Sequence, residues 1–446
     1  MVAGAPTYYS LPSILASRMP LALGRDVIGL APGEDTLATT LRQSGYATGA
    51  FSAANPYISS RFGYDEGFAV FRDFLDFENS PTPIGNTTRP VGRGTPKGRL
   101  NRALRKTAQA VRLGRFYDEA YFQYCLRIAA PPVRDLDDLR KFPTAETVVG
   151  GAEAWLGSLG SRPFFLWIHL MDPHSPYYPP ASAFEELTGR KPSARRARYL
   201  NEFWNRLDLE PERLQRHKEA VIELYDAAIR GVDSQIAQLV RFLKRSDRWD
   251  DCVFALTADH GEEFLDHGRR FHAPIGLAEE IARVPLLIRV PGKVKKEPAA
   301  FVLSHLDLAP TLLEILAVAP PPSFQGTSLW RSLEGGITND APAITECAYG
   351  CTNPFSEETR LAPKLLAVRD GRYKLIIRLS PGAGEEVYDL QTDPGEKSPV
   401  AASEGREIRA HLLQAAMEHM RNTSRSQSVD ARLKARLRDL RLKLLA

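Results

Sequence analysis

The chain has 446 residues, of which 43% are hydrophobic and 25% are charged, and its formal net charge is +4 at pH 7. This composition excludes a disordered chain, a fibre and a small scaffold held by disulfides. The charge is unevenly distributed: residues 89–116 carry +9 and residues 421–446 carry +6, so the remainder carries −11. Because the basic character is local, we expect the main body not to bind nucleic acid.

Three features of the sequence bear on cellular location. The four cysteines are scattered and complete no zinc-binding pattern, which predicts free thiols in a reducing compartment. The most apolar long stretch, residues 301–319, contains three ionisable side chains, so we expect no transmembrane segment. The first residues lack the basic start and the long apolar run of a secretory signal, and we therefore predict a cytoplasmic protein.

Residues 77–141 look like an insertion. Residues 80–98 are rich in Pro, Gly, Thr and Asn, which predicts a loop, and residues 99–130 have the pattern of a basic helix. We interpret the insertion as a solvated lid or an oligomer contact. Nucleic-acid binding is the alternative, and the absence of interleaved aromatics or of a known binding module disfavours it.

From residue 144 onward, apolar runs of strand length alternate with amphipathic stretches of helix length. We expect strands at 162–170, 251–257 and 284–290, and helices at 144–156 and 218–246. Continuous apolar strands suit a sheet that is covered on both faces. The alternation therefore predicts a three-layer α/β domain with a mainly parallel sheet, over residues 1–340.

After about residue 340 the pattern changes to short strands separated by turn signals. We expect strands at 364–368, 373–378 and 386–390 and a helix near 404–419, which together predict a small α+β C-terminal subdomain over 341–446. In the last stretch, leucines recur at helical spacing among arginines. We interpret it as a helix docked on the body, with a helix on a membrane surface as the alternative.

The strongest chemical signal directly follows the strand expected at 251–257. Asp259 and His260 stand just past its carboxyl end, where open parallel sheets place their ligands. A carboxylate and an imidazole that converge there suit Ca²⁺, Mg²⁺, Mn²⁺ or Zn²⁺. The alternative is a helix N-cap by Asp259 beside a surface histidine.

Two further histidines follow strand ends. His174 stands in a loop that Pro173 and Pro176 stiffen, where it is able to donate a hydrogen bond to an anionic substrate oxygen. His272 follows Asp259 and His260 by a short loop. Three histidines on such loops are less typical of core packing than one histidine would be.

These segments resemble the sulfatase family of the alkaline-phosphatase superfamily. The similarity is carried by TADHGEEFLDHG and the residues after it to 292, by RPFFLWIHLMDPHSPYYPP, and by several other stretches in the family's order, including 36–57, 303–329 and 373–396. The resemblance implies that Asp259 and His260 bind one divalent cation. Ca²⁺ is the expected ion, and Mg²⁺ or Mn²⁺ are the alternatives. It implies that His174 and His272 contact a sulfate or phosphate group.

The nucleophile position departs from the family pattern. An alignment without gaps places Thr7 there, and threonine cannot become the formylglycine that sulfatases make from Cys or Ser. A metal-activated threonine is still able to attack phosphorus. The alternative nucleophile is Ser10, in a Ser-Leu-Pro-Ser stretch that fits the motif locally but needs a deletion.

A second departure concerns the metal ligands. In the family, a first strand precedes the nucleophile and ends in one or two metal-binding aspartates, whereas this sequence starts at the nucleophile loop. Either the true start lies upstream or the metal shell is incomplete.

We expect a hydrolase of small-molecule or carbohydrate sulfate or phosphate esters. The alternatives are a phosphodiester or phosphonate hydrolase with Thr7 as nucleophile, and an inactive binding protein.

Overall fold

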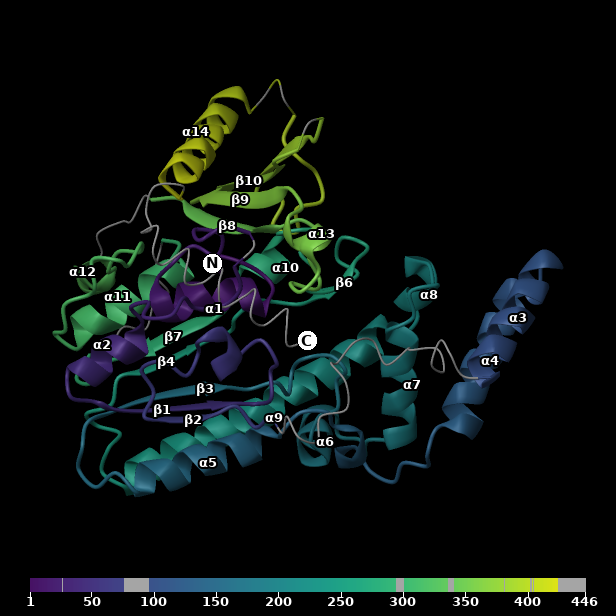
Figure 1. Cartoon of the computed structure of the whole chain (residues 1–446), viewed down its shortest axis with the longest axis horizontal. Helices are drawn as coiled ribbons and strands as arrows, with labels where there is room; N and C mark the ends of the chain where they lie inside the picture. The colour runs from purple at the N-terminus through teal and green to yellow at the C-terminus, as the bar shows by residue number, and fades with distance from the viewer. Residues whose placement is uncertain are drawn as a thin grey trace. The chain divides into compact units, whose positions relative to one another are not determined.

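The structure is a computed structural model that describes residues 1–25, 27–75, 96–293, 301–335, 341–380, 382–401, 403 and 405–423. The chain divides into two compact units, which are described separately (Figure 1). Unit 1 comprises Met1–Asp73, Val148–His169 and Ala237–Ala446, and unit 2 comprises Phe74–Thr147 and Leu170–Ile236. Most of the loop expected at 80–98 and the whole helix expected near the C-terminus lie outside the described residues.

Unit 1 contains a parallel sheet in the order β2-β1-β3, formed by β1 (Ala47–Ser52), β2 (Val70–Arg72) and β3 (Phe164–His169). The register of β1 on β3 runs from Ala47 opposite Phe164 to Ser52 opposite His169. Both strands therefore end at the same edge of the sheet. The strand expected at 162–170 is confirmed.

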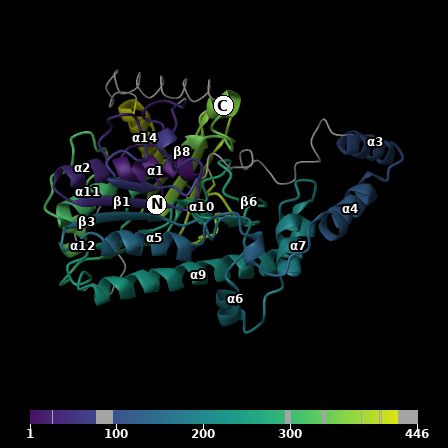
Figure 2. The same cartoon turned by 60° about the horizontal axis from the view of Figure 1, so that its bottom comes forward.

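One face of β3 packs on two helices, and the other face packs on the N-terminal helix. Phe164, Leu166 and Ile168 contact a cluster from α5 (Ala145–Gly157) and α9 (Lys218–Arg245), which lie along this face in Figures 1 and 2. Trp167, which points the other way, packs against the cluster of α1 (Thr7–Ala16) and α11 (His305–Ile315). The three-layer α/β architecture and both predicted helices are confirmed.

The strands expected at 251–257 and 284–290 form, but not in the surroundings that we expected. β4 (Phe254–Thr257) and β7 (Leu286–Arg289) pair with each other and run antiparallel. Leu256, Leu286 and Leu287 are 37%, 36% and 54% exposed, so the prediction that these strands are buried is wrong. An apolar run is buried only where neighbours cover it, and within the described residues β4 is hydrogen-bonded to β7 alone.

The C-terminal part of unit 1 is a four-stranded antiparallel sheet with a helix packed on it. Its order is β11-β10-β9-β8, and the helix contributes Leu412 and Ala416 to a shared core. The predicted α+β elements are confirmed, while the boundary near residue 340 stays a prediction. The elements are β8 (Ala343–Ala348), β9 (Lys364–Asp370), β10 (Tyr373–Arg378), β11 (Glu385–Asp389) and α14 (Arg406–Thr423).

Shorter elements connect these parts of unit 1. They are α2 (Leu37–Gln43), a 3₁₀ turn (Ser60–Phe62), β5 (Glu263–Phe264), β6 (Arg270–Phe271), α10 (Glu279–Ala282), α12 (Trp330–Gly335) and α13 (Glu357–Arg360).

The described part of unit 2 is built from helices and turns. The helix expected over 99–130 is broken, because Arg112 adopts a left-handed conformation between two separate helices. No described helix of the chain is long and apolar enough to cross a lipid bilayer. The elements of unit 2 are α3 (Pro96–Ala110), α4 (Gly114–Tyr124), a π-helical turn (Cys125–Ala129), a 3₁₀ turn (Asp137–Leu139), α6 (Ala181–Thr188), α7 (Ala194–Trp204) and α8 (Pro211–Gln215).

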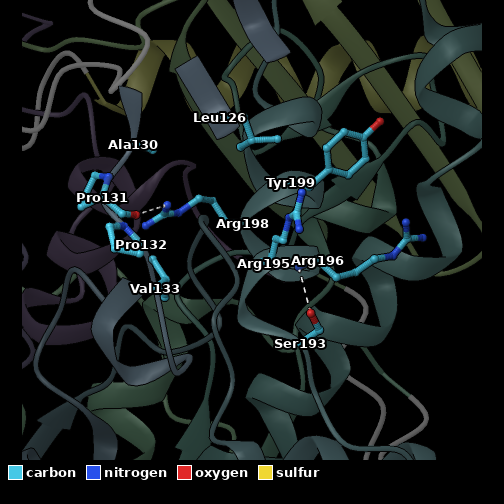
Figure 3. Close-up of a pocket in the computed structure, with 10 residues that line it drawn as sticks. All are labelled: Leu126, Ala130, Pro131, Pro132, Val133, Ser193, Arg195, Arg196, Arg198 and Tyr199. Atoms are coloured by element: carbon cyan, nitrogen blue, oxygen red, sulfur yellow. Dashed lines mark hydrogen bonds between the residues drawn. The ribbon is translucent and has the colours of Figure 1, made fainter. Parts of the chain in front are cut away.

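A cavity of about 600 Å³ lies in unit 2, between the turn after α4 and the start of α7 (Figure 3). Its wall combines apolar side chains with three arginines, and the Arg198 guanidinium donates a hydrogen bond to the Pro131 carbonyl at 2.7 Å. None of the residues that the sequence analysis assigned to a site lines this cavity.

Candidate active site

Asp259 and His260 follow β4 directly, at the carboxyl end where we expected them. The Asp259 Oδ1 accepts a hydrogen bond from the His260 backbone N–H at 3.1 Å, which fixes the carboxylate beside the imidazole. No helix begins at Asp259, and the His260 side chain is only 7% exposed. The alternative reading of an N-cap beside a surface histidine is therefore wrong.

The close approach of this segment to α10 requires glycine at position 261. The Gly261 N–H donates to the Ile281 carbonyl at 3.0 Å, and a Cβ at Gly261 would lie 1.9 Å from the Glu280 carbonyl oxygen. The Asp-His-Gly sequence thus holds its first two side chains in place because the third residue has no side chain.

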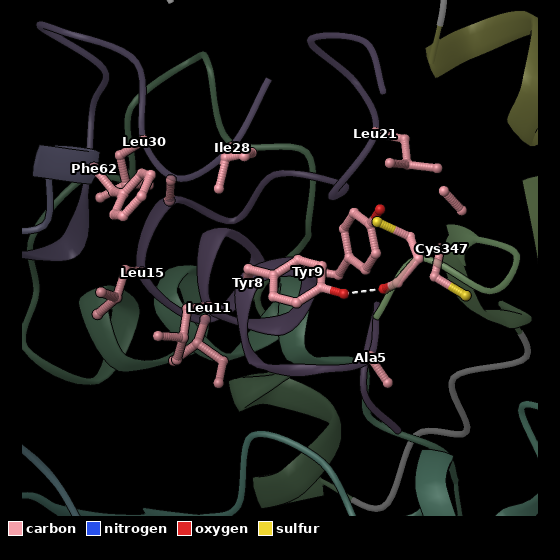
Figure 4. Packing of buried hydrophobic residues seen from close by; sticks show 14 of the residues in the cluster. Ala5, Tyr8, Tyr9, Leu11, Leu15, Leu21, Ile28, Leu30, Phe62 and Cys347 are labelled. Carbon is pink, nitrogen blue, oxygen red and sulfur yellow. Dashed lines mark hydrogen bonds between the residues drawn. The ribbon is translucent and has the colours of Figure 1, made fainter. Parts of the chain in front are cut away.

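Thr7 is brought to this site by the packing of α1. It is the first residue of that helix, which is anchored in the core by Tyr8, Leu11 and Leu15 (Figure 4). The Tyr8 hydroxyl donates a hydrogen bond to the Cys351 carbonyl. With the helix held in this way, the Thr7 Oγ1 lies 3.3 Å from the His260 Nε2.

The hydrogen bonds of His260 define which ring nitrogen carries the proton. Its Nδ1 lies 2.8 Å from the Gly261 carbonyl oxygen, which can only accept, so the Nδ1 holds the proton. Burial lowers the pKa of His260, which favours the neutral ring. The Nε2 lone pair therefore faces the Thr7 hydroxyl and is available to a hydrogen-bond donor or a metal ion.

Three more histidines, His169, His272 and His305, interact electrostatically with the Asp259 carboxylate. Burial lowers the pKa of His169, lowers that of His272 to about 4 and lowers that of His305 to about 3. Burial also acts to raise the pKa of Asp259, but His260, His169 and the Thr7 hydrogen bond outweigh it and hold this pKa below its ordinary value. The result at neutral pH is one carboxylate among neutral imidazoles, which is a receptive environment for a cation.

His272, which the sequence analysis assigned to contact with a sulfate or phosphate group, lies beside His260. Its ring centroid lies 4.2 Å from that of His260, and its Nδ1 lies 3.3 Å from the Glu262 carboxylate. Because a carboxylate accepts, the Nδ1 is the protonated nitrogen of the neutral ring. The proximity is a finding, while contact of His272 with a substrate stays a prediction.

His169 and His305 were not assigned to the site from the sequence. His169 is the last residue of β3, so the position of that strand's end was the available signal. His305 begins α11, and its Nε2 lies 3.4 Å from the Thr257 hydroxyl. No spacing in the sequence links His305 to Asp259, because packing of α11 alone brings them together.

The two candidate nucleophiles differ in their surroundings. The Ser10 Oγ is fully buried and donates a hydrogen bond to the Thr7 carbonyl at 3.4 Å, within the same helix. The Thr7 hydroxyl instead faces His260. This geometry supports Thr7, although the nucleophile itself stays a prediction.

His174 belongs to unit 2, in the loop after β3. Its Nδ1 donates a hydrogen bond to the Ser175 carbonyl at 2.7 Å, and its ring packs edge-on against Phe142 with centroids 5.6 Å apart. These contacts fix the ring orientation within unit 2. Whether His174 converges with Asp259 stays a prediction.

Several solved structures share the fold of this chain. Phosphonate monoester hydrolase of Agrobacterium radiobacter superposes with a TM-score of 0.62 at 20% identity, covering 95% of this chain and 87% of that one. A protein solved in complex with its substrate D-glucosamine-2-N,6-O-disulfate superposes with a TM-score of 0.60 at 18% identity, covering 96% and 90%. At these identities the likeness establishes the shared fold.

The family is established by sequence. The Sulfatase family model matches residues 1–318, and the model for the C-terminal part of N-sulphoglucosamine sulphohydrolase matches residues 269–441. This chain belongs to the sulfatase family, and the resemblance on which the sequence analysis relied is confirmed.

Curated relatives match over part of their length. The Delta 4,5-hexuronate-2-O-sulfatase of Bacteroides thetaiotaomicron is 30% identical over 189 residues, which are 42% of this chain and 37% of that protein. The arylsulfatase of Clostridium perfringens is 30% identical over 270 residues, 57% of this chain and 52% of that protein. The chain thus spans about a third to a half of the length of these relatives.

Proteins of this family generally use a divalent cation, and the donor atoms at the β4 end fit one. Asp259 is held ionised, and the unprotonated Nε2 of His260 faces the same space as the Thr7 hydroxyl. Carboxylate oxygen and imidazole nitrogen are common ligands of divalent metals. These two residues are candidates for part of a coordination shell.

Proposed function

We propose that this chain hydrolyses sulfate or phosphate esters through a site formed by Thr7, Asp259, His260 and His272. The observation that carries the proposal is the 3.3 Å approach of the Thr7 hydroxyl to the His260 Nε2, at the carboxyl end of β4. A hydroxyl beside a metal-type donor pair is the arrangement that a covalent hydrolytic mechanism requires. Membership of the sulfatase family supports the reaction class.

In this proposal Asp259 and His260 hold one divalent cation, and Thr7 is the nucleophile. The cation, when bound, favours the ionised Thr7 hydroxyl and neutralises charge on the ester oxygens. The Thr7 Oγ forms a bond to phosphorus or sulfur as the bond to the leaving-group oxygen breaks. The proton that the Thr7 hydroxyl gives up passes to water, and His272, whose ring lies beside His260, contacts an oxygen of the sulfate or phosphate group.

The start of α1 gives Thr7 a second advantage. Thr7 is the first residue of a ten-residue helix, and the positive end of the helix dipole favours the negative charge that develops there. His174 is proposed to donate a hydrogen bond to a substrate oxygen from unit 2. Its Nδ1 is committed to the Ser175 carbonyl, so its Nε2 is the atom for this contact.

Threonine at the nucleophile position favours phosphorus over sulfur. Formylglycine releases sulfate by eliminating the ester through its second hydroxyl, and threonine has one hydroxyl. Water must therefore attack the sulfated threonine at sulfur, which is slow, whereas water attacks a phosphorylated threonine in line more readily. We therefore favour phosphodiester or phosphonate substrates whose leaving group is a small molecule or a carbohydrate.

The test compares two aryl esters under defined metal conditions. The chain is stripped with a chelator, reloaded with Ca²⁺, Mg²⁺ or Mn²⁺, and assayed with an aryl phosphodiester and an aryl sulfate. We expect faster turnover of the phosphodiester than of the aryl sulfate. We also expect higher activity with Ca²⁺ than with Mg²⁺ or Mn²⁺. Faster turnover of the aryl sulfate would overturn the preference for phosphorus.

An inactive binding protein is the second candidate. It is favoured by the small donor set, because Asp259 and His260 contribute two ligands whereas Ca²⁺ takes six to eight oxygens. In that case the chain would bind a sulfated or phosphorylated carbohydrate without turnover, which calorimetry with such an ester detects.

We also propose a cytoplasmic location, which the four unpaired cysteines support.

A further inference from the structure

Three side chains from distant segments of unit 1 converge away from the donors already described. His267 lies in the turn between β5 and β6, Glu280 lies in α10, and Glu396 lies in the segment after β11. One ligand atom from each residue lies within 4.8 Å of the other two. His267 belongs to the Asp-His-Gly stretch at 266–268 that forms part of the family-like motif and that the proposed mechanism leaves unused.

The converging atoms are buried and poorly satisfied. The His267 Nε2, the Glu280 Oε2 and the Glu396 Oε1 are inaccessible to water. Within the described part of the chain, His267 and Glu280 have a long contact with each other at 3.4 Å, and the Glu396 Oε1 pairs with Lys374 at 3.0 Å. Glu396 as a whole is only 2% exposed. Buried polar atoms are normally hydrogen-bonded, so an imidazole nitrogen and a carboxylate oxygen that have only a long contact with each other suit a bound ligand.

The protein's own cations only partly neutralise the carboxylates of this cluster. The Lys374 Nζ lies 3.0 Å from both the Glu396 Oε1 and the Glu279 Oε1, and Arg369 pairs with the other oxygen of Glu279. Three carboxylates, those of Glu279, Glu280 and Glu396, therefore face two cations. In the ion pairs of the described residues, Glu280 is left with the His267 imidazole as its partner.

A further cation, Arg269, forms its hydrogen bonds with another carboxylate. The Arg269 guanidinium donates through its Nε and a terminal nitrogen to the Glu263 carboxylate, at 2.9 to 3.2 Å. Among the described residues, the Glu280 Oε2 pairs with the His267 Nε2, at 3.4 Å. A cation bound between His267 and Glu280 would balance the charge of this carboxylate.

We propose that His267, Glu280 and Glu396 form a second divalent-cation site, suited to Zn²⁺ or Mn²⁺ rather than to Ca²⁺ or Mg²⁺. One imidazole nitrogen with two carboxylate oxygens is a donor set that transition metals accept, whereas Ca²⁺ and Mg²⁺ take mainly oxygen. Water completes the shell. The role is structural, because the three ligands tie the β5–β6 turn and α10 to the C-terminal sheet.

The site is coupled to the candidate active site through backbone contacts. The Glu279 N–H donates to the Glu396 Oε2 at 2.6 Å, and the Ile281 carbonyl accepts from the Gly261 N–H at 3.0 Å. α10 thus contacts Glu396 on one side and the Asp259–His260 segment on the other. Binding of a cation at Glu280 and Glu396 holds α10 in the position that the active-site segment needs.

The experiment measures Zn²⁺ binding to the full chain after removal of metals with a chelator. An Asp259→Ala background removes one ligand of the other cation site, so that binding at His267, Glu280 and Glu396 is seen separately. We expect one equivalent of Zn²⁺ by calorimetry, a rise in Tm on adding Zn²⁺, and, with Co²⁺ instead, visible absorption bands from the metal.

Substitutions at the ligands distinguish a cation from a proton. His267→Gln, Glu280→Gln and Glu396→Gln should each weaken Zn²⁺ binding by more than the roughly 10- to 100-fold that loss of an outer-shell partner costs. The exposed Glu358→Gln is the matched control and should change nothing. If Asp259→Ala does not fold, the same three substitutions in the otherwise unchanged chain should remove one equivalent of bound Zn²⁺.

Two results would overturn the proposal. One is the absence of Zn²⁺ or Co²⁺ binding to a folded Asp259→Ala chain. The other is binding that His267→Gln and Glu280→Gln leave unchanged. Either result would make His267 and Glu280 an ordinary ion pair with the proton on the imidazole.

Discussion

Two sets of metal-type donors lie in unit 1, and the fold assembles them differently. Asp259 and His260 are neighbours in sequence, and the end of β4 presents them together with Thr7 and neutral imidazoles. His267, Glu280 and Glu396 come from three segments that only the tertiary structure joins. The first set has one carboxylate beside a hydroxyl, which suits chemistry. The second has two carboxylates and no nucleophile, which suits a structural cation.

The largest effect is expected from the hydroxyl that only the first set has. Thr7→Ala should lower turnover of an aryl phosphodiester by about three orders of magnitude or more, because no other group there forms the covalent bond. Thr7→Ser keeps the hydroxyl and serves as the matched control. Ser10→Ala should retain most activity, since Ser10 bonds within its own helix. A loss confined to Ser10→Ala, with a formylglycine mass at residue 10, would contradict this assignment.

Metal affinity should separate the two sets of donors. Asp259→Ala and His260→Ala should abolish cation binding at the β4 end, because they remove the donors that the end of β4 contributes. Both variants should still bind Zn²⁺ at His267 and Glu280. Calorimetry with Ca²⁺ and then with Zn²⁺ measures each site in turn. Loss of Zn²⁺ binding in both folded variants would overturn the second site.

The backbone contact between the sets predicts a change in stability. Gly261→Ala should lower the free energy of unfolding by about 3 kcal/mol, because the new Cβ meets the Glu280 carbonyl, which cannot rotate away. Both cation sites should weaken together in this variant. Gly150→Ala, in α5 with open space around it, is the control and should be neutral or slightly stabilising. Denaturant unfolding monitored by circular dichroism provides the comparison.

A buried carboxylate that the protein itself satisfies provides a contrast to Glu280. Glu346 accepts from the Leu21 N–H at 2.8 Å and lies 3.0 Å from the His419 Nε2. Burial acts to raise the pKa of Glu346, but His419, Lys364 and the hydrogen bonds hold it below the ordinary value of 4.5. Glu346 therefore stabilises the fold above pH 4.5, and this contribution is lost as the pH falls through its folded-state pKa.

Glu346→Gln should lower the free energy of unfolding at pH 7 by about 2 kcal/mol. The variant should also lose part of the acid dependence of stability below pH 4.5. Unfolding measured between pH 3 and pH 7, in the presence of a chelator, tests this without any contribution from bound metal. An unchanged acid dependence would mean that His419 and Lys364 do not hold Glu346 ionised.

Local pattern predicted much of the fold. The apolar run of β3, the periodic helices α5 and α9, and the turn-bounded strands β9 and β10 all form close to their expected ranges. Asp259 and His260 were predictable because a strand end orients residues that directly follow it. In contrast, the break between α3 and α4 depends on the left-handed conformation at Arg112, which no strong turn signal marks.

The sequence alone determined the hydrophobic period of each element and the residues at its ends, because both depend on residues that are close together in the chain. Tertiary structure decided which ends meet: His305 reaches the site through α11, Thr7 through α1, and Glu396 reaches Glu280 from the C-terminal subdomain. It also decided burial, as the exposed leucines of β4 and β7 show. An apolar side chain specifies a preference for contact, whereas the partner that covers it depends on packing between distant parts of the chain.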